Sequence, residues 1–339
     1  MALLHRTATA SARWPYGGDR GPAMRALPWL TWVPVAAVGA LLLVAVLAPG
    51  LASSLALPLA IMGAAIGIPH GAADHLVPWW WDTAGRKGST ARPTATRMVA
   101  FASSYAAIAA AALTAFFLAP TAALVVFLIL SGLHFGRGEV VTSAERSGRR
   151  APTMSSEWPV TLAHGGVVVG LLLWARPSDI DPLLRGLSPR LAEATAAGRV
   201  PGLLLVAAAV VVALVVLLHG GRRLEAAELA LLAAVFTVAP PLAAFGIYFG
   251  LWHSLRHTGR LLDLARGHNR ARQVDDGWRA AGRTVARAAA APSVVALLAV
   301  LYLWWASDLA GLQAEVGVLL ALTFPHAAVV WALDRRVSG

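Results

Sequence analysis

The chain has 339 residues, of which 58% are hydrophobic and 13% charged, and its mean hydropathy is +0.66. A soluble globular protein is about 45–50% apolar and about 25% charged, so this composition argues against soluble enzymes and disordered proteins and favours a polytopic membrane protein. The absence of cysteine excludes disulfides, thiolate metal sites and thiol catalysis, while the net charge of +11, carried by arginines between apolar runs, predicts a cytoplasmic membrane surface and no nucleic-acid binding.

The hydropathy pattern predicts an all-α fold, a polytopic transmembrane helical bundle of about ten spans, because a lipid-exposed backbone must satisfy its own hydrogen bonds. Residues 1–26 are polar and predict a disordered N-terminal tail, and residues 27–339 are predicted to form a single integral membrane domain. The first run, Leu27 to Pro49, is too long for a signal-peptide core and no convincing cleavage site follows it, so we interpret it as an uncleaved span. The other predicted spans are 51–69, 98–118, 120–136, 158–175, 200–218, 226–239, 242–257, 290–308 and 314–333.

The pair of segments around Pro240-Pro241 has two interpretations, two short spans or one long kinked helix. With ten spans and a cytoplasmic tail, 24 of the 28 basic residues fall on the inner side, and the other four lie between Arg176 and Arg199. The rule that cytoplasmic loops are enriched in Lys and Arg therefore favours ten spans over nine and places both termini in the cytoplasm. The abundance of Ala and Arg is typical of a GC-rich bacterial genome, so we expect the cell membrane to be a bacterial cytoplasmic one.

The stretch 258–289 is rich in arginine and follows the eighth predicted span. It is compatible with an amphipathic helix on the membrane surface, and equally with a solvated polar face.

Ten histidines carry most of the functional information, because ionisable groups at membrane depth are costly and often mark a site. His253 and His257 are spaced i, i+4, which places both imidazoles on one helix face, one turn apart, in a good geometry for binding one metal ion. Packing alone also produces such pairs.

His70 lies in the stretch Gly67-Ile68-Pro69-His70-Gly71, where proline and glycine weaken a helix on both sides of the imidazole. Backbone breaks at membrane depth are tolerated where they line a cavity or are buried in protein. Asp74 is four residues further and could orient His70 or another ligand through the second ring nitrogen, whereas His75 points elsewhere on an ideal helix and should not share a metal ion with His70. Asp74 and His75 could equally be an interfacial polar pair.

His134 ends the span 120–136 and is followed by Glu139, which we interpret either as a base or orienting group behind a ligand, or as a charge partner of Arg137. In the ten-span topology, the histidines near the inner ends of three spans reach the same membrane depth on the same side. These are His70, His134, His253 and His257. Four neutral imidazoles without carboxylates suit Fe, Cu, Zn or Ni, and ligand type alone does not choose among them.

The remaining histidines receive other interpretations. His326 lies in the inner half of the last span and is expected behind the ligands, as a group supporting them. His164 is more typical of a polar packing residue, and His5, His219 and His268 are typical of tail or interfacial positions.

Taken together, the motifs resemble the Brp/Blh family of membrane β-carotene 15,15'-dioxygenases. The matching landmarks occur in family order and are Pro69-His70-Gly71 with Asp74-His75, His134-Phe135-Gly136 with Glu139, Trp252-His253 with Arg256-His257, and Pro325-His326. The resemblance implies a catalytic membrane domain that binds non-haem Fe(II) through His70, His134, His253 and His257. It also implies that O2 is added across the central double bond of β-carotene to give two all-trans-retinal molecules.

A lipid-dissolved polyene would reach such a site laterally, between helices within the bilayer. Aromatic residues near the histidine motifs are candidates for the substrate tunnel, although each is also typical of core packing: Phe135, Tyr248, Phe249, Trp252 and Phe324. Retinal would then pass to an acceptor, for which a rhodopsin-type protein is one candidate.

Two other functional classes compete with this one. Membrane desaturases and hydroxylases also use histidines on membrane helices, but they need adjacent histidine pairs, and this chain has none. A transporter, or a non-catalytic carotenoid- or haem-binding membrane protein, is the remaining alternative.

Overall fold

The computed structural model describes residues 23–84, 94–149, 151–306 and 311–338. Within these ranges the chain is helical and contains no strand, which confirms the predicted all-α class. The first half comprises α1 (Ala23–Ala26), α2 (Trp29–Leu47), α3 (Pro49–Ser54), α4 (Ala56–Gly67), the short 3₁₀ turns η1 (Ile68–His70) and η2 (Asp74–Leu76), α5 (Val77–Ala84), α6 (Ala95–Leu118), α7 (Pro120–Arg146), η3 (Met154–Ser156) and α8 (Trp158–Gly165). The second half comprises the π-helical turn η4 (Gly166–Leu171), α9 (Leu172–Trp174), α10 (Pro177–Leu187), α11 (Pro189–Ala197), α12 (Arg199–His219), α13 (Arg223–Val238), α14 (Pro241–Ile247), the π-helical turn η5 (Tyr248–His253), α15 (Ser254–Ala271), α16 (Trp278–Ala306) and α17 (Gly311–Ser338).

Fewer helices than expected are long and apolar enough to cross a membrane. Among the described residues there are seven, or eight if the segment Trp158–Trp174 and α10, bent by 87° relative to each other, count as one broken span. The predicted number of ten is therefore not confirmed. The difference lies mainly at 226–239 and 242–257. The helix α13 has only 16 residues and begins with charged side chains, and the helix after Pro240 becomes polar from His253 onward.

The N-terminal tail was predicted to extend to residue 26, but its last four residues form the helix α1. Ala23 and Met24 are buried, and the backbone N–H of Ala23 donates to both carboxylate oxygens of Asp263 at 2.9 Å. This contact fixes the beginning of the described chain against α15. Residues 1–22 lie outside the described residues.

The helix that follows Pro240 is continuous from Pro241 to Ala271 and runs through α14, η5 and α15. Pro240 has an extended conformation and Pro241 occupies the first helical turn, where a proline costs no hydrogen bond. The arginine-rich stretch was interpreted as a surface helix or a solvated face. Its first part, residues 258–271 of α15, is instead mostly buried and packs against α5 and α16, whereas residues 272–289 are for the most part exposed or half-exposed.

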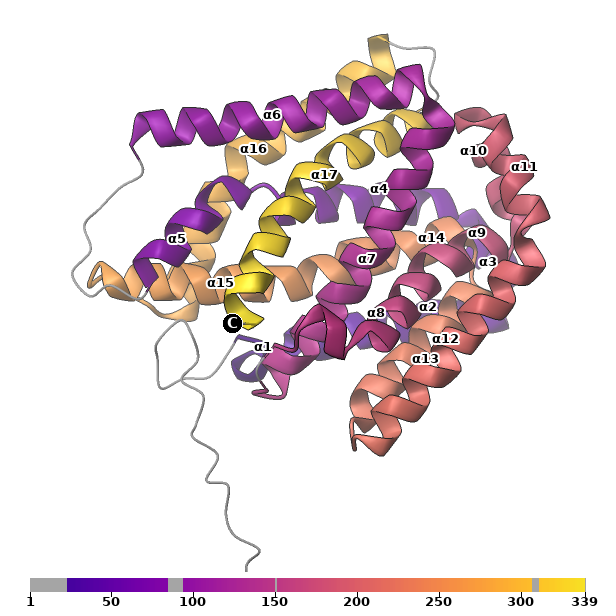
Figure 1. Ribbon diagram of the computed structural model, residues 1–339, viewed down its shortest axis with the longest axis horizontal. Coiled ribbons are helices and arrows are strands. Elements are labelled where there is room, and N and C mark those ends of the chain that lie inside the picture. Colours follow the sequence, from indigo (N-terminus) through magenta and orange to yellow (C-terminus); the bar gives the residue numbers. More distant parts are fainter. Residues whose placement is uncertain (1–22, 85–93, 150, 307–310, 339) are drawn as a thin grey trace, which may run out of the picture.

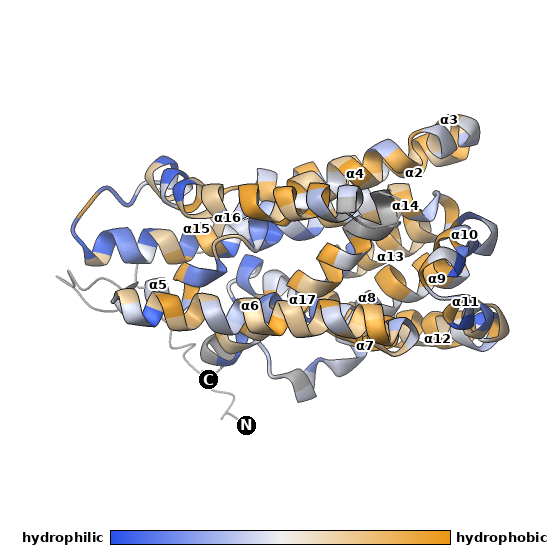
Figure 2. Cartoon of the chain, turned by 90° about the horizontal axis from the view of Figure 1, so that it is seen from above, coloured by the Kyte–Doolittle hydropathy of each residue, from blue (hydrophilic) through white to orange (hydrophobic). Residues whose placement is uncertain are grey.

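The long helices form two layers with the polar centre of the molecule between them (Figures 1 and 2). One layer contains α2, α4, α15 and α16, and the other contains α6, α7, α12 and α17. Hydrophilic residues concentrate along α15 and near α5, whereas α4, α12 and α17 are mostly hydrophobic (Figure 2).

Glycines allow the close crossing of α4 with α14 and η5. A Cβ atom on Gly63 would collide with the backbone of Gly246, and a Cβ atom on Gly250 would lie 2.8 Å from the Cα of Gly63. The helices therefore approach closely enough to bring η1, which follows α4 and carries His70, beside the histidines of η5 and α15.

Candidate metal centre

Five buried imidazoles from four separate parts of the chain meet between the two layers. They are His70 in η1, His134 in α7, His253 in η5, His257 in α15 and His326 in α17. The ring of His70 lies 4.8 to 5.3 Å, centre to centre, from those of His253, His257 and His326. The ring of His134 lies 5.0 Å from that of His253 and 5.1 Å from that of His326.

The ring nitrogens are close enough to share one ion. His70, His253 and His326 each offer a nitrogen, and these three atoms lie within 4.8 Å of one another. The Nε2 atoms of His134 and His253 are 3.3 Å apart. Two nitrogens bound at about 2.1 Å to the same metal ion are separated by roughly 3 Å, so this pair has the spacing of neighbouring ligands.

Several inward nitrogens have no hydrogen-bond partner among the described residues. Nε2 is buried and unpartnered in His70, His257 and His326. A buried polar atom without a partner costs about 1–3 kcal/mol, and three of them converging on one point are better explained by a cation than by packing. The residues present therefore fit a divalent metal with a preference for imidazole.

The opposite ring nitrogens of two candidate ligands are held in place. Nδ1–H of His70 donates to the carbonyl of Gly67, and Nδ1–H of His326 donates to Asp74 Oδ2 at 2.8 Å. A hydrogen bond at Nδ1 fixes the tautomer that presents Nε2 as the lone-pair donor, which is the usual arrangement behind a metal-ligating histidine. Asp74 thus supports His326.

Local departures from α-helical geometry set the direction of two of the imidazoles. Pro69 and Gly71 end α4 and produce the turn η1, which carries His70 out of the α-helical register. His253 is the last residue of a π-helical turn, a conformation found often at functional sites. The rings of His253 and His257 are nearly parallel, at 17°, with centres 6.5 Å apart, as expected one turn apart on one face.

A layer of buried ion pairs connects α15 to its neighbours directly beside the histidines. Arg256 pairs with Glu139 at 2.5 Å and with Glu228 at 2.8 Å, and Trp252 donates its indole N–H to Glu139 at 3.0 Å. One turn further, Arg260 pairs with Glu145 at 3.1 Å and with Asp334 at 2.7 Å. Because these arginines share one face of α15 with His253 and His257, the pairs fix the rotation of that helix relative to α7 and α17.

One large cavity begins at the histidines and runs between α6, α16 and α17. Its volume is about 820 Å³, within the range of ligand sites, and its wall is almost entirely apolar. His70, His134, His253 and His326 form one part of the wall, and alanines dominate the faces of α6 and α16. These are Ala102, Ala106, Ala109, Ala110, Ala291, Ala296 and Ala299.

The aromatic residues suggested by the sequence divide into two groups. Phe135 and Phe249 line the cavity. Tyr248 and Trp252 are completely buried in the core behind it, and Phe324 packs among the apolar residues of α6, α7 and α10. Three of the five therefore do not contact the cavity.

The supporting residues are also placed differently from the sequence expectation in several cases. His326 was expected behind the ligands, but its ring lies among them. Glu139 is paired with Arg256, whereas Arg137 lies 3.8 Å from Asp334. His75 belongs to the cavity wall and its Nδ1 contacts the carbonyl of Ala72 at 3.1 Å, outside the cluster.

The other histidines lie away from the cluster where they are described. Nδ1 of His164 contacts the carbonyl of Val160, and Nδ1 of His268 contacts Thr83 Oγ1 at 2.7 Å. His268 was expected at an interface but is buried, and His5 lies outside the described residues. A contributor absent from the sequence analysis is Tyr105 of α6, which lines the cavity and donates to Asp74 Oδ2 at 3.2 Å. A single tyrosine in a predicted span that otherwise holds only apolar and small hydroxyl side chains was the signal that could have identified it.

Comparisons with known proteins point in one direction. Residues 61–334 match the family model described as beta-carotene 15,15'-dioxygenase. The chain is 29% identical over 315 residues to the probable beta-carotene 15,15'-dioxygenase Blh of Halobacterium salinarum, covering 82% of this chain and 84% of that protein. It is 27% identical over 200 residues to the beta-carotene 15,15'-dioxygenase of an uncultured marine bacterium, 57% of this chain and 64% of that protein. It is also 27% identical over 250 residues, 67% of this chain, to the probable dioxygenase Brp of Halobacterium salinarum. No solved structure matches the chain.

Proposed function

Because this chain belongs to the beta-carotene 15,15'-dioxygenase family, we propose that it cleaves the central double bond of β-carotene with O2 and releases two molecules of all-trans-retinal. Each carbon of the broken double bond takes one oxygen atom, so the reaction needs no further oxidant. The chain is accordingly a carotenoid-cleaving dioxygenase of the membrane.

One observation carries this proposal, the position of four of the five clustered histidines in the wall of an apolar cavity. A polyene offers no hydrogen-bonding group along its length, so only an apolar wall can hold it and only shape can select which bond lies beside the reactive ion. The wall provides this with small side chains on α6 and α16 and with Phe135 and Phe249 nearest the histidines.

The cavity opens toward the outside of the bundle between α6 and α16. Several of its lining residues on these helices are exposed on the surface of the protein, including Ala106, Val295 (66%) and Tyr302 (62%). Both helices are among those able to cross a membrane, so this mouth faces lipid, and a carotenoid dissolved in the bilayer can enter without passing through water. The retinal products leave by the same apolar route, into the membrane and on to an acceptor such as a rhodopsin-type protein.

The metal ion of this centre is proposed to be Fe(II), held by His70, His134, His253, His257 and His326. When bound, it supplies the redox capacity that O2 activation requires and that a closed-shell ion lacks. The protein's own residues have separate tasks: Asp74 keeps Nε2 of His326 toward the ion, the ion pairs of Arg256 and Arg260 hold α15 in register, and the apolar walls exclude water.

The orientation in the membrane follows from charge. We infer that the end with α15 and the ion-pair layer faces the cytoplasm of a bacterial cell, with both termini on that side, because the arginine-rich connections gather there.

The deciding experiment is expression in a bacterium that accumulates β-carotene, followed by assay of the purified protein in detergent. Active protein bleaches the host, contains about one Fe per chain, and converts β-carotene and O2 to retinal without shorter apocarotenals. Polyene absorption that copurifies with the protein without any turnover would identify a carotenoid-binding protein instead, and a Soret band would identify a haem protein.

A further inference from the structure

Tyr105 links the wall of the substrate cavity to a candidate metal ligand. Its hydroxyl donates to Asp74 Oδ2 at 3.2 Å, and the same oxygen accepts Nδ1–H of His326 at 2.8 Å. The three side chains come from α6, η2 and α17, so this chain of hydrogen bonds joins an outer helix of the bundle to the metal centre.

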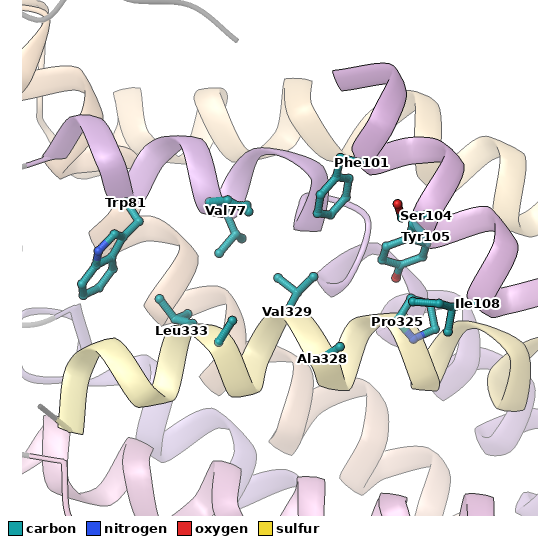
Figure 3. Close-up of a pocket in the computed structure, with 12 residues that line it drawn as sticks. Val77, Trp81, Phe101, Ser104, Tyr105, Ile108, Pro325, Ala328, Val329 and Leu333 are labelled. Carbon is teal, nitrogen blue, oxygen red and sulfur yellow. The ribbon is translucent and has the colours of Figure 1, made fainter. Parts of the chain in front are cut away.

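The ring of Tyr105 also separates two cavities. Tyr105 and Phe101 line both the large cavity and a second one of about 300 Å³, which lies between α5, α6 and α17. Figure 3 shows the ring of Tyr105 beside Pro325 and Ile108, at the end of this second cavity opposite Trp81 and Leu333.

Asp74 depends on its partners for its orientation. Its carboxylate is buried, and its second oxygen, Oδ1, has no hydrogen-bond partner among the described residues. Oδ2 therefore accepts from both Tyr105 and His326, and the loss of the tyrosine hydroxyl leaves the carboxylate fixed only by the imidazole that it orients.

We propose that Tyr105 is a positioning residue, whose hydroxyl fixes Asp74 so that His326 presents Nε2 to the metal ion, and whose ring closes the large cavity toward the second one. This inference rests on the metal centre of the proposed function. It adds a residue that touches the substrate space on one side and supports the ion on the other.

The test compares Tyr105→Phe with Tyr302→Phe. Both substitutions remove one phenolic oxygen from a tyrosine that lines the large cavity, but only Tyr105 donates to Asp74. Metal-free protein is titrated with Co(II), whose visible absorption reports the ligand geometry, and Fe(II) affinity is measured by competition with a chelator.

We expect Tyr105→Phe to lower metal affinity about 10-fold, at the lower end of the effect of losing a group that supports a metal ligand, and to change the Co(II) spectrum. Asp74→Asn should change both in the same direction and by more. The ring is retained in Tyr105→Phe, so kcat for β-carotene should fall while KM stays close to that of the wild type. Tyr302→Phe should leave metal affinity and the Co(II) spectrum unchanged.

The possible failures are distinguishable. Wild-type protein that binds metal but does not cleave β-carotene contradicts the proposed function and leaves the Co(II) comparison valid. Equal metal affinity and equal spectra for Tyr105→Phe, Tyr302→Phe and the wild type overturn the role of Tyr105, whatever the activity. A rise in KM with unchanged kcat and metal affinity overturns it too, because it would assign Tyr105 to substrate contact alone.

Discussion

At the scale of single residues, the centre consists of neutral ligands surrounded by charges that are already paired. The ligand atoms that lie within 4.8 Å of one another are ring nitrogens of His70, His253 and His326. Among the described residues, no carboxylate oxygen belongs to this group. Glu139, Glu145 and Asp334 lie nearby, but each is paired with an arginine of α15. Asp74, which accepts hydrogen bonds from His326 and Tyr105, is the carboxylate that contacts a candidate ligand, whereas pairing with arginine neutralises the other three, as burial requires.

His326 provides the clearest test of the ligand set. Since its ring lies among the other imidazoles and its Nε2 is unpartnered, we expect His326→Ala to lower bound iron and activity as severely as His70→Ala does. Metal analysis after dialysis, together with retinal formation, measures the effect. His164→Ala is the matched control, because that imidazole is also buried in a membrane helix but contacts the carbonyl of Val160. A His326→Ala protein with full iron content would remove this residue from the ligands.

His268 makes the stability of the protein depend on pH. Burial of its imidazole, with a smaller effect from Arg272, lowers the pKa of His268 to about 4, from the usual value near 6.5. The unfolded chain then takes up a proton below pH 6.5 that the folded chain accepts only near pH 4, so folding stability is lost as pH falls through this window.

The prediction is that His268→Gln flattens the fall in the midpoint of thermal unfolding between pH 6.5 and pH 4, measured in detergent. At pH 8 the imidazole of His268 is neutral in both the folded and the unfolded wild-type chain, so its protonation does not affect the free energy of unfolding there. His219→Gln is the control, because His219 is exposed at the end of α12. Identical slopes for wild type and His268→Gln would contradict the assigned pKa.

At the scale of elements, the helical segments were largely predictable, and their role in the membrane was less so. All ten predicted spans contain helix, because apolar runs of that length need an internally bonded backbone. The length of the apolar runs did not correctly predict membrane spans at α13 and at α14 to α15. These segments gain much of their stability from buried ion pairs, and a hydropathy scale does not show whether a charged side chain is paired. The buried first part of the arginine-rich stretch, residues 258–271, was misread for the same reason.

The crossing of α4 with α14 and η5 yields a prediction at this scale. Gly63→Ala should destabilise the protein by about 1–3 kcal/mol and displace His70 from the cluster, because the new Cβ atom meets the backbone of Gly246, which cannot move aside like a side chain. Thermal unfolding and iron content measure the two effects. Gly39→Ala in α2 is the control, since nothing lies within 4 Å of a Cβ atom at that position, and it should stabilise slightly or have no effect. Equal stability of the two variants would show that the crossing has room to relax.

At the scale of the whole molecule, the two layers of helices create a site that local patterns describe only in part. The motif spacings single out His70, His134, His253 and His257, because breaks, i+4 pairs and span ends are visible along the chain. They place His326 only behind the ligands, and they do not reveal that α17 brings its ring among them or that α6 contributes Tyr105, because both depend on how helices distant in sequence pack together. Nor do they reveal which aromatic residues face the cavity, since a membrane helix that is apolar all round gives no periodic signal for its inner face.

The mouth between α6 and α16 leads to the last prediction. Ala106 is exposed on α6 and lines the large cavity, so Ala106→Trp places a bulky ring in the opening without touching the histidines. Turnover of β-carotene at limiting concentration should fall at least 10-fold, a difference of about 1.4 kcal/mol in the free energy of reaching the transition state, while iron content stays at the wild-type level. The matched control is Ala107→Trp, the neighbouring exposed alanine of the same helix, which lies outside the lining of the cavity. Two tryptophan variants with equal activity would mean that the carotenoid reaches the histidines by another route, and variants that both lose iron would mean that α6 supports the metal centre along its whole length.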